Sequence, residues 1–268
     1  MVRNGSRQEG DAGVSPLGAG LAGVLRRHFA GALDLLLPIA CVSCDSLIPE
    51  SEPGIVCALC WSRLALLPSP QCDRCGHPLQ ATTCRWCDLL PPFVRAARSV
   101  CWMPGEPAAA IVHALKYGGW TKVAAGMALR MSRVAWPRDV TEERAGLVPV
   151  PLAPARTRER GYNQSALLAL SLADRWNVPV WPDAVTRPRG TRSQTELTPE
   201  ERVGNVAGSF QLVERARDRI RGKHIVLVDD VVTTAATLNE CARVLYEGGA
   251  RIISYVTFGR ARASGDRL

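Results

Sequence analysis

Two adjacent carboxylates followed by a hydroxyl-rich turn are the residues of this chain best suited to bind a ligand. Asp229 and Asp230 directly follow four branched apolar residues, 225–228, which is the pattern of a strand buried on both faces. The turn after them consists of small or hydroxylated residues: Thr233, Thr234, Ala235, Ala236 and Thr237. Carboxylates in this position bind sugar hydroxyls or Mg²⁺, and the unpaired N–H groups of a following helix favour a phosphate. The pattern therefore predicts a sugar-phosphate site; the alternative is an N-capping turn whose acids only complement the helix dipole.

Eight of the ten cysteines form four Cys-x-x-Cys pairs, which is the spacing of metal ligands. The pairs are Cys41 with Cys44, Cys57 with Cys60, Cys72 with Cys75, and Cys84 with Cys87. Two thiolates at this spacing reach one metal at about 2.3 Å, and a second pair completes a tetrahedral site. The sequence therefore predicts two structural Zn²⁺ ions rather than a redox dithiol or a disulfide framework. The spacing is compatible with sequential pairing and with a cross-braced arrangement.

The segment between the cysteine pairs contains few apolar residues, so we expect it to form no core of its own and to fold on metal binding. Its arginines and tryptophans, among them Arg63, Arg74 and Trp61, could contact the phosphates and bases of a nucleic acid. The two cysteines outside the pairs, Cys101 and Cys241, are predicted to be small buried hydrophobic residues.

Strands and helices alternate from about residue 98 onward. The strand pattern occurs at 99–103, 147–151, 225–229 and 252–258. The helical spacing of apolar residues occurs at 106–117, 123–134, 163–176 and 238–247. This alternation predicts an α/β fold in which a parallel sheet carries helices on both faces. Open sheets of this kind bind ligands beyond the carboxyl ends of their strands, where Asp229 and Asp230 fall.

Three basic residues and a polar stretch accompany the acidic pair. Arg156 and Arg160 follow the second predicted strand, at the same sheet edge as Asp229. Their guanidinium groups could hold a pyrophosphate; the alternatives are a solvated pair or a helix cap. Lys116 ends a predicted helix, where it would contact a phosphate or complement the helix dipole. The stretch 187–201 has the composition of a mobile lid.

Composition limits the class of protein. A chain of 268 residues with 47% hydrophobic residues is long enough for one ordinary domain and a smaller module, and it is too apolar to be disordered. The net charge of +8 fits an anionic ligand, either a phosphorylated metabolite or nucleic acid, or else a solvated arginine-rich surface. No uncharged apolar run reaches the roughly 18 residues of a membrane span, so we expect no membrane insertion and a cytoplasmic location.

The acidic stretch resembles the signature of type I phosphoribosyltransferases, which bind phosphoribosyl pyrophosphate (PRPP). The resemblance implies that Asp229 and Asp230 grip the ribose 2′- and 3′-hydroxyls and that the turn 233–237 wraps the 5′-phosphate. The family usually has glycine where this chain has Ala235. If the turn needs a positive φ at that position, alanine costs about 1–2 kcal/mol.

Three further segments resemble the ComF-like competence proteins, which join a zinc module to a phosphoribosyltransferase domain. The segments are 115–119, 148–164 and 192–197. With the acidic stretch and the cysteine pairs, the resemblance covers residues 35 to 260. It implies two structural Zn²⁺ ions, Mg²⁺ bound together with PRPP, and contacts of Arg156, Arg160 and Arg192 with the pyrophosphate.

The fold class predicted from these patterns is a type I phosphoribosyltransferase-like parallel sheet flanked by helices and preceded by a double zinc ribbon. The predicted segments are a disordered tail (1–20), an amphipathic helix (21–40), the double zinc ribbon (41–95), the phosphoribosyltransferase-like domain (96–262) and a second tail (263–268).

Three functions are compatible with these predictions. The first is an enzyme that transfers phosphoribose from PRPP to an unknown acceptor, with Asp229, Asp230 and Arg192 as its catalytic residues. The second is a protein that handles single-stranded DNA during competence, together with a competence helicase machinery. The third is a regulator that binds PRPP without chemistry. Fold alone does not separate them.

Overall fold

The computed structural model describes residues 39–49, 54–79, 84–188 and 208–262. The predicted tails, nearly all of the predicted helix 21–40, and Arg192 lie outside these residues. The described residues from Ala40 onward belong to one compact unit.

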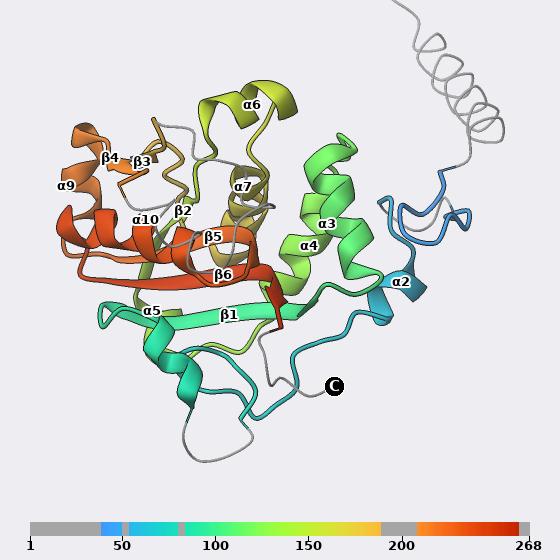
Figure 1. The fold of residues 1–268 in the computed structure, drawn as a ribbon, viewed down its shortest axis with the longest axis horizontal. Coiled ribbons are helices and arrows are strands. Elements are labelled where there is room, and N and C mark those ends of the chain that lie inside the picture. The colour runs from blue at the N-terminus through green and yellow to red at the C-terminus, as the bar shows by residue number, and fades with distance from the viewer. Residues whose placement is uncertain (1–38, 50–53, 80–83, 189–207, 263–268) are drawn as a thin grey trace, which may run out of the picture. The chain divides into compact units, whose positions relative to one another are not determined.

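A four-stranded parallel sheet forms the centre of this unit, with the strand order β1-β6-β5-β2 (Figure 1). Its strands are β1 (Val94–Met103), β2 (Arg144–Pro149), β5 (His224–Val232) and β6 (Ile252–Ala261). A separate antiparallel pair consists of β3 (Val185–Thr186) and β4 (Gln211–Leu212). The predicted parallel sheet is confirmed.

Helices cover both faces of the sheet. Successive residues of a strand point to opposite sides, and in β5 the residues on both sides are apolar and buried. Val226 and Val228 of β5 lie in a core with α3 (Ala108–Tyr117), α4 (Val123–Met131) and α7 (Gln164–Trp176). Ile225 and Leu227 lie in a second core with α9 (Arg217–Ile220) and α10 (Ala236–Glu247). The remaining helices are short: α2 (Ala58–Ser62), η1 (Arg85–Leu89), α5 (Arg138–Glu143), α6 (Pro154–Arg160) and η3 (Glu214–Ala216). None of the helices in the described ranges is long and apolar enough to cross a bilayer.

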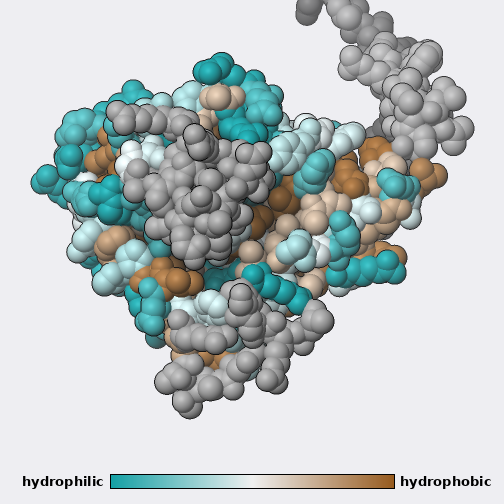
Figure 2. Space-filling model, viewed as in Figure 1, coloured by the Kyte–Doolittle hydropathy of each residue, from teal (hydrophilic) through white to brown (hydrophobic). Residues whose placement is uncertain are grey.

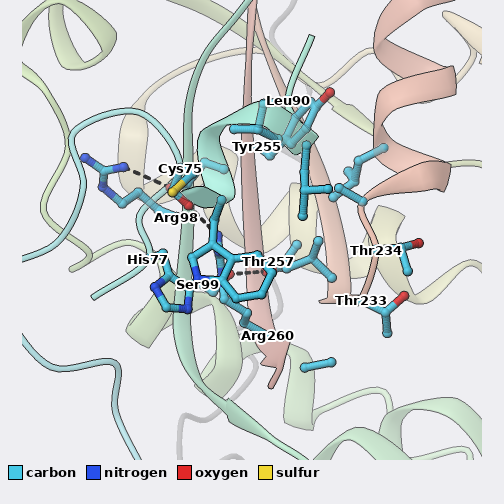
Figure 3. A pocket seen from close by; sticks show the side chains of 17 residues that line it. Cys75, His77, Leu90, Arg98, Ser99, Thr233, Thr234, Tyr255, Thr257 and Arg260 are labelled. Carbon is cyan, nitrogen blue, oxygen red and sulfur yellow. Dashed lines mark hydrogen bonds between the residues drawn. The ribbon is translucent and has the colours of Figure 1, made fainter. Parts of the chain in front are cut away.

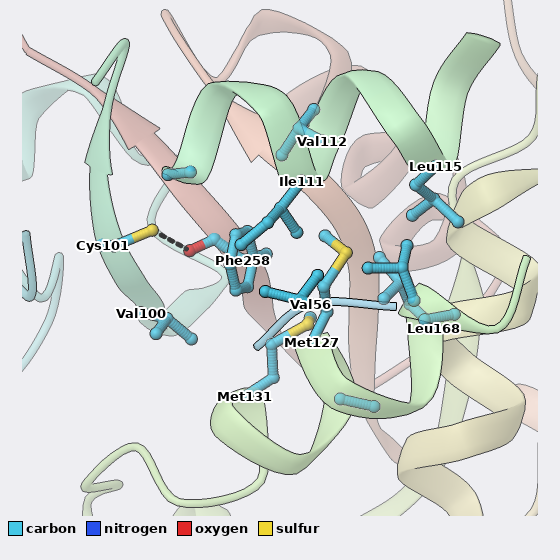
Figure 4. Close-up of a cluster of buried hydrophobic side chains, with 14 of the residues drawn as sticks. Val56, Val100, Cys101, Ile111, Val112, Leu115, Met127, Met131, Leu168 and Phe258 are labelled. Carbon is cyan, nitrogen blue, oxygen red and sulfur yellow. Dashed lines mark hydrogen bonds between the residues drawn. The ribbon is translucent and has the colours of Figure 1, made fainter. Parts of the chain in front are cut away.

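The cysteine-rich segment contributes to both cores. Ile55 and Val56, between the first two cysteine pairs, are buried in the core of α3 and α4, where Val56 lies beside Met127 and Met131 (Figure 4). Leu90, after the last pair, is buried in the core on the other face. The folding of this segment therefore depends on more than metal binding, because several of its apolar residues are buried against the sheet domain.

All four strands of the parallel sheet extend beyond their predicted bounds, as β1 and β5 illustrate. β1 begins at Val94 and not at residue 99, because Arg95 and Arg98 interrupt the apolar run yet are neutralised or hydrogen-bonded in the fold. Arg95 forms an ion pair of 2.6 Å with Asp139, and Arg98 donates to backbone carbonyls from each guanidinium nitrogen. β5 continues to Val232, so the acidic pair lies inside the strand and not at its end.

Candidate functional site

The acidic pair becomes accessible because a neighbouring strand ends beside it. Pro149, the last residue of β2, pairs with Val228, and Asp229 pairs only with Thr257 of β6. The chain turns away after Val150, whose N–H still donates to the Val228 carbonyl oxygen. The carboxyl end of β2 therefore leaves space next to Asp229, as expected for ligand sites in parallel sheets.

Each carboxylate of the pair has a partner from a different helix. Asp229 Oδ1 accepts hydrogen bonds from Ser165 Oγ (2.7 Å), in the first turn of α7, and from the N–H of Asp230 (2.9 Å). Asp230 Oδ2 lies 2.6 Å from Nζ of Lys116, in the last turn of α3. Ser165 is placed by Asn163, whose side chain caps α7 and donates to the Val150 carbonyl oxygen.

Burial and proximity shift the protonation of these groups. Burial and then the charge of Asp230 raise the pKa of Asp229 well above its usual range. For Lys116, burial lowers the pKa, but the Asp230 carboxylate outweighs burial and the net pKa is raised. Lys116 is therefore a charged ammonium at neutral pH, and the charge of Asp229 is held at a cost to stability.

A cavity of about 340 Å³ joins the acidic pair to the small-residue turn, and we call it the acid-pair cavity. The predicted residues that line it are Lys116, Asp229, Asp230, Thr233, Ala235, Ala236 and Thr237. Thr234 instead lines a smaller cavity of about 60 Å³, which shares Thr233 and Ala235 with it (Figure 3). The structure thus brings together the residues on both sides of the predicted sugar-phosphate site.

The turn has a left-handed backbone conformation that favours glycine. Ala235 has φ +60° and ψ 2°, and α10 begins at the next residue. A left-handed conformation costs a residue with a Cβ about 1–2 kcal/mol. The backbone of the turn is therefore strained next to the cavity, and strained backbone is typical of functional sites.

Sequence reasoning missed Arg187, which lines the acid-pair cavity; Gln164, which also lines it, belongs to the segment 148–164 that the family resemblance had identified. Arg187 lies just after β3, and its guanidinium stands 5.1 Å from the ring centre of Phe210. Burial lowers the pKa of Arg187, and the charge of Asp229 partly opposes this effect. Its position at the start of the polar stretch 187–201 was the available signal.

Arg156 and Arg160 do not line the cavity in the part of the chain that the structure describes. They lie on α6, a helix with no buried residue whose surface is hydrophilic (Figure 2). Arg156 pairs with Glu159 at 3.2 Å. Arg160 donates to Oε1 of Gln164, so it reaches the edge of the cavity indirectly. The predicted contacts of these two arginines, and of Arg192, stay predictions.

The eight paired cysteines form two groups of four, each suited to one metal ion. The first cysteine cluster and the second contain consecutive pairs: Cys41, Cys44, Cys57 and Cys60 in the first, and Cys72, Cys75, Cys84 and Cys87 in the second. Within a cluster all Sγ atoms lie within 4.8 Å of one another, and the Cys44–Cys57 separation is 3.7 Å. A tetrahedron with bonds of about 2.3 Å has edges of about 3.8 Å, so structural zinc fits both clusters. The pairing is sequential and not cross-braced.

Residues near the clusters that were candidates for nucleic-acid contacts have structural partners. Arg74 donates to the carbonyl oxygens of Leu90 (2.8 Å) and Pro91 (2.9 Å). The guanidinium of Arg130 covers the ring of Trp61 at 3.6 Å. These contacts hold the cysteine segment on the sheet domain.

The segment around the second cysteine cluster contacts α10 and β6 next to the small-residue turn. Asn239, in the first turns of α10, donates to the Leu89 carbonyl oxygen at 2.8 Å and accepts from the Tyr255 hydroxyl. Arg260 of β6 donates to the carbonyl oxygen of Cys75. Figure 3 shows Cys75 and His77 on one side of the small cavity and Thr233 and Thr234 on the other.

Comparison with known proteins supports the arrangement of two modules. Residues 32–90 match the double zinc ribbon domain, and residues 164–267 match the phosphoribosyl transferase domain. The DNA utilization protein YhgH of Escherichia coli strain K12 is 32% identical over 226 residues, which cover 82% of this chain and 96% of that protein. Competence protein F of Haemophilus influenzae is 28% identical over 232 residues, which cover 83% and 96%.

More distant similarities are weaker. Competence protein ComFC of Bacillus subtilis is 26% identical over 231 residues, which cover 79% of this chain and 90% of that protein. The solved glutamine PRPP amidotransferase of B. subtilis is 17% identical with a TM-score of 0.34, and it covers 51% of this chain and 27% of its own.

Replacing Ala235 with glycine should stabilise the protein. Relief of about 1–2 kcal/mol of left-handed strain outweighs the entropic cost of glycine, about 0.5–1 kcal/mol, so the free energy of unfolding should rise by up to about 1.5 kcal/mol. Ala236→Gly is the matched control, because that residue is helical and should lose about 0.5–1 kcal/mol. Urea denaturation of both variants measures the difference; equal losses in the two would contradict the strained turn.

Replacing Asp229 with asparagine should stabilise the protein at neutral pH and not below pH 4. The pKa of Asp229 is raised in the fold, so the folded state binds the proton more tightly than the unfolded chain, whose aspartates titrate near about 3.9. Stability of the wild type should therefore fall relative to Asp229→Asn as pH rises from 4 toward neutrality. Thermal unfolding across this range checks the sign, with the exposed Asp174→Asn as control; a variant that is less stable at pH 7 than the wild type refutes it.

Proposed function

This chain belongs to the family of the ComF competence proteins and the DNA utilization protein YhgH, and on that premise we propose that its acid-pair cavity binds the phosphorylated pentose of PRPP or a related sugar phosphate. The observation that carries the proposal is the meeting of Asp229, Asp230 and the left-handed Ala235 turn in one cavity of about 340 Å³. Either feature alone is common in proteins; a phosphate turn beside paired carboxylates suits a sugar monoester.

The 5′-phosphate is assigned to the turn 233–237. Ala236 and Thr237, the first two residues of α10, line the cavity, and the N–H groups in the first turn of a helix carry partial positive charge. The pentose hydroxyls then donate to Asp229 and Asp230.

The pyrophosphate of PRPP is assigned to the basic residues in and near the cavity. Arg187 presents a planar guanidinium, which binds phosphate through paired hydrogen bonds. Arg160 would reach the same region through Gln164, and Arg156 and Arg192 are proposed as further contacts. In the transfer reaction, the bond from the sugar C1 to the pyrophosphate oxygen breaks and a bond from C1 to the acceptor forms, while the acceptor loses a proton. The protein's part is to orient the sugar and to balance the charge of the departing pyrophosphate.

Calorimetric titration with PRPP and with ribose 5-phosphate tests the proposal. The wild type should bind both, and Asp229→Asn should weaken both by at least about tenfold, because its amide replaces a charged acceptor of the sugar hydroxyl. Since this substitution should stabilise the fold at neutral pH, weaker binding would not come from unfolding. Asp174→Asn should bind as the wild type does. Absence of heat in the wild type, or equal affinity in Asp229→Asn, would contradict the proposed site.

A second candidate function is the handling of single-stranded DNA, which the names of the relatives suggest and one described feature favours. A cavity of about 620 Å³ lies beside β1 and is lined by two tryptophans and several arginines, among them Trp61, Trp136, Arg130 and Arg133. Because Arg130 already covers the Trp61 ring, phosphate contacts by the basic groups of this groove favour the second function more than base stacking does.

Charge reversal at Arg133 tests the second function. Arg133 is exposed, so Arg133→Glu should keep the fold and lower affinity for a single-stranded oligonucleotide, with the slope of log affinity against log salt smaller by about 1. Arg219→Glu, on α9, removes a similar surface charge away from this cavity and serves as control. Gel shifts across a salt series measure both; equal losses in the two variants would mean that the cavity beside β1 is not the binding site.

A further inference from the structure

Lys116 enters the acid-pair cavity from a helix end that is firmly held. The Tyr162 hydroxyl donates to the carbonyl oxygen of Leu115 at 2.6 Å, which fixes the last turn of α3. The ammonium of Lys116 lies 2.6 Å from Oδ2 of Asp230, and the Lys116 side chain is 25% exposed against 4% for Asp230. The carbonyl end of a helix also favours a positive charge.

One oxygen of each acid in the pair is engaged by the protein itself. Asp229 Oδ1 accepts from Ser165 Oγ and from a backbone N–H, and Asp230 Oδ2 holds Lys116. Among the described residues that line the cavity, the acids are Asp229 and Asp230, and the cations are Lys116 and Arg187. Two acidic and two basic side chains therefore line the described part of the cavity before a ligand binds.

This arrangement does not fit a magnesium ion coordinated by the pair. Mg²⁺ demands near-octahedral oxygen ligands at about 2.0–2.1 Å. An ion on Asp230 would stand within a few ångströms of the ammonium, in a place where water screens the repulsion poorly. Direct coordination of Mg²⁺ by the pair therefore disagrees with the side chains of this site, whereas the family resemblance implied Mg²⁺ bound together with PRPP.

We propose that Lys116 is the resident cation of the acidic pair and takes the place of a divalent ion there, so that this chain meets its sugar phosphate with a built-in positive charge. The ammonium has three N–H donors, and Asp230 is its ionic partner in the described part of the chain. A ligand oxygen beside Asp230 then receives a hydrogen bond and a charge without a metal ion on the protein. This inference concerns the same cavity as the proposed function. The pairing of Lys116 with the acids does not depend on that function, whereas the expected binding of PRPP without Mg²⁺ rests on it.

Binding of Mn²⁺ alone, followed by electron paramagnetic resonance on the zinc-loaded full chain, tests the inference without any sugar phosphate. The wild type should show no Mn²⁺ site that depends on Asp229, whereas Lys116→Gln should bind Mn²⁺ at least about tenfold more tightly, because two carboxylates then lack their cation. Lys122→Gln removes an exposed lysine at the start of α4 and should behave as the wild type. A wild-type Mn²⁺ site that disappears in Asp229→Asn would overturn the inference.

A double variant controls for loss of folding. Lys116→Gln leaves the buried Asp230 without its partner and should lower the melting temperature, and Mg²⁺ should restore part of the loss. Lys116→Gln/Asp230→Asn removes both charges, so it should fold better than the single variant and lose the Mn²⁺ site. A folded Lys116→Gln that gains no Mn²⁺ affinity would refute the inference; if it does not fold, the wild-type measurement decides.

PRPP titrations in buffer freed of divalent ions on a chelating resin separate the inference from the proposed function. The wild type should bind PRPP in this buffer, and Lys116→Gln should bind it only after Mg²⁺ is added. Wild-type binding that needs Mg²⁺ contradicts the resident cation. Absence of PRPP binding in both buffers contradicts the proposed function, and the Mn²⁺ measurement then decides on Lys116 independently.

Discussion

Two adjacent carboxylates inside a central strand are the constraint around which the described fold is arranged. Leaving a buried carboxylate without a partner costs several kcal/mol, so each acid must be met by a group from another element. Lys116 and Ser165 meet this demand from α3 and α7, which lie on one face of the sheet. β2 must also end at Pro149, because another paired residue would close the space beside Asp229. The position of three elements thus follows from one pair of side chains.

The cysteine clusters stabilise this arrangement from outside the sheet. The first cluster extends the core over α3, the helix that delivers Lys116, and the second lies against the turn before α10. Asn239 links the carbonyl oxygen of Leu89 to the first turns of α10. Zinc in the two clusters would therefore stabilise α3, which carries Lys116, and the turn before α10. Neither cluster lines the acid-pair cavity in the described residues.

The sequence was sufficient to predict the features that depend on neighbouring residues. The acids, the small-residue turn, the cysteine pairs and the parallel sheet all follow from spacing within a short window. The pairing of Lys116 with Asp230 could not be predicted, because 114 residues separate them and nothing local fixes the register of α3 against β5. The early start of β1 was missed for a related reason: its arginines, which resemble loop residues in the sequence, are satisfied by distant partners. Arg187 became visible only when β3 placed it at the cavity.

Two unfavourable features of the described fold, backbone strain and a disfavoured charge, occur at residues that line the acid-pair cavity. Ala235 is strained, and Asp229 carries a charge that its surroundings disfavour. The hydrogen bond from Ser165 and the charge of Lys116 offset only part of the cost at Asp229, because its pKa stays raised, whereas nearby arginines such as Arg98 donate from each guanidinium nitrogen. A ligand that brings hydroxyl donors to Asp229 and a phosphate to the turn would offset both costs together. The uneven distribution of strain therefore argues that the cavity is built for an occupant and is not an accident of packing.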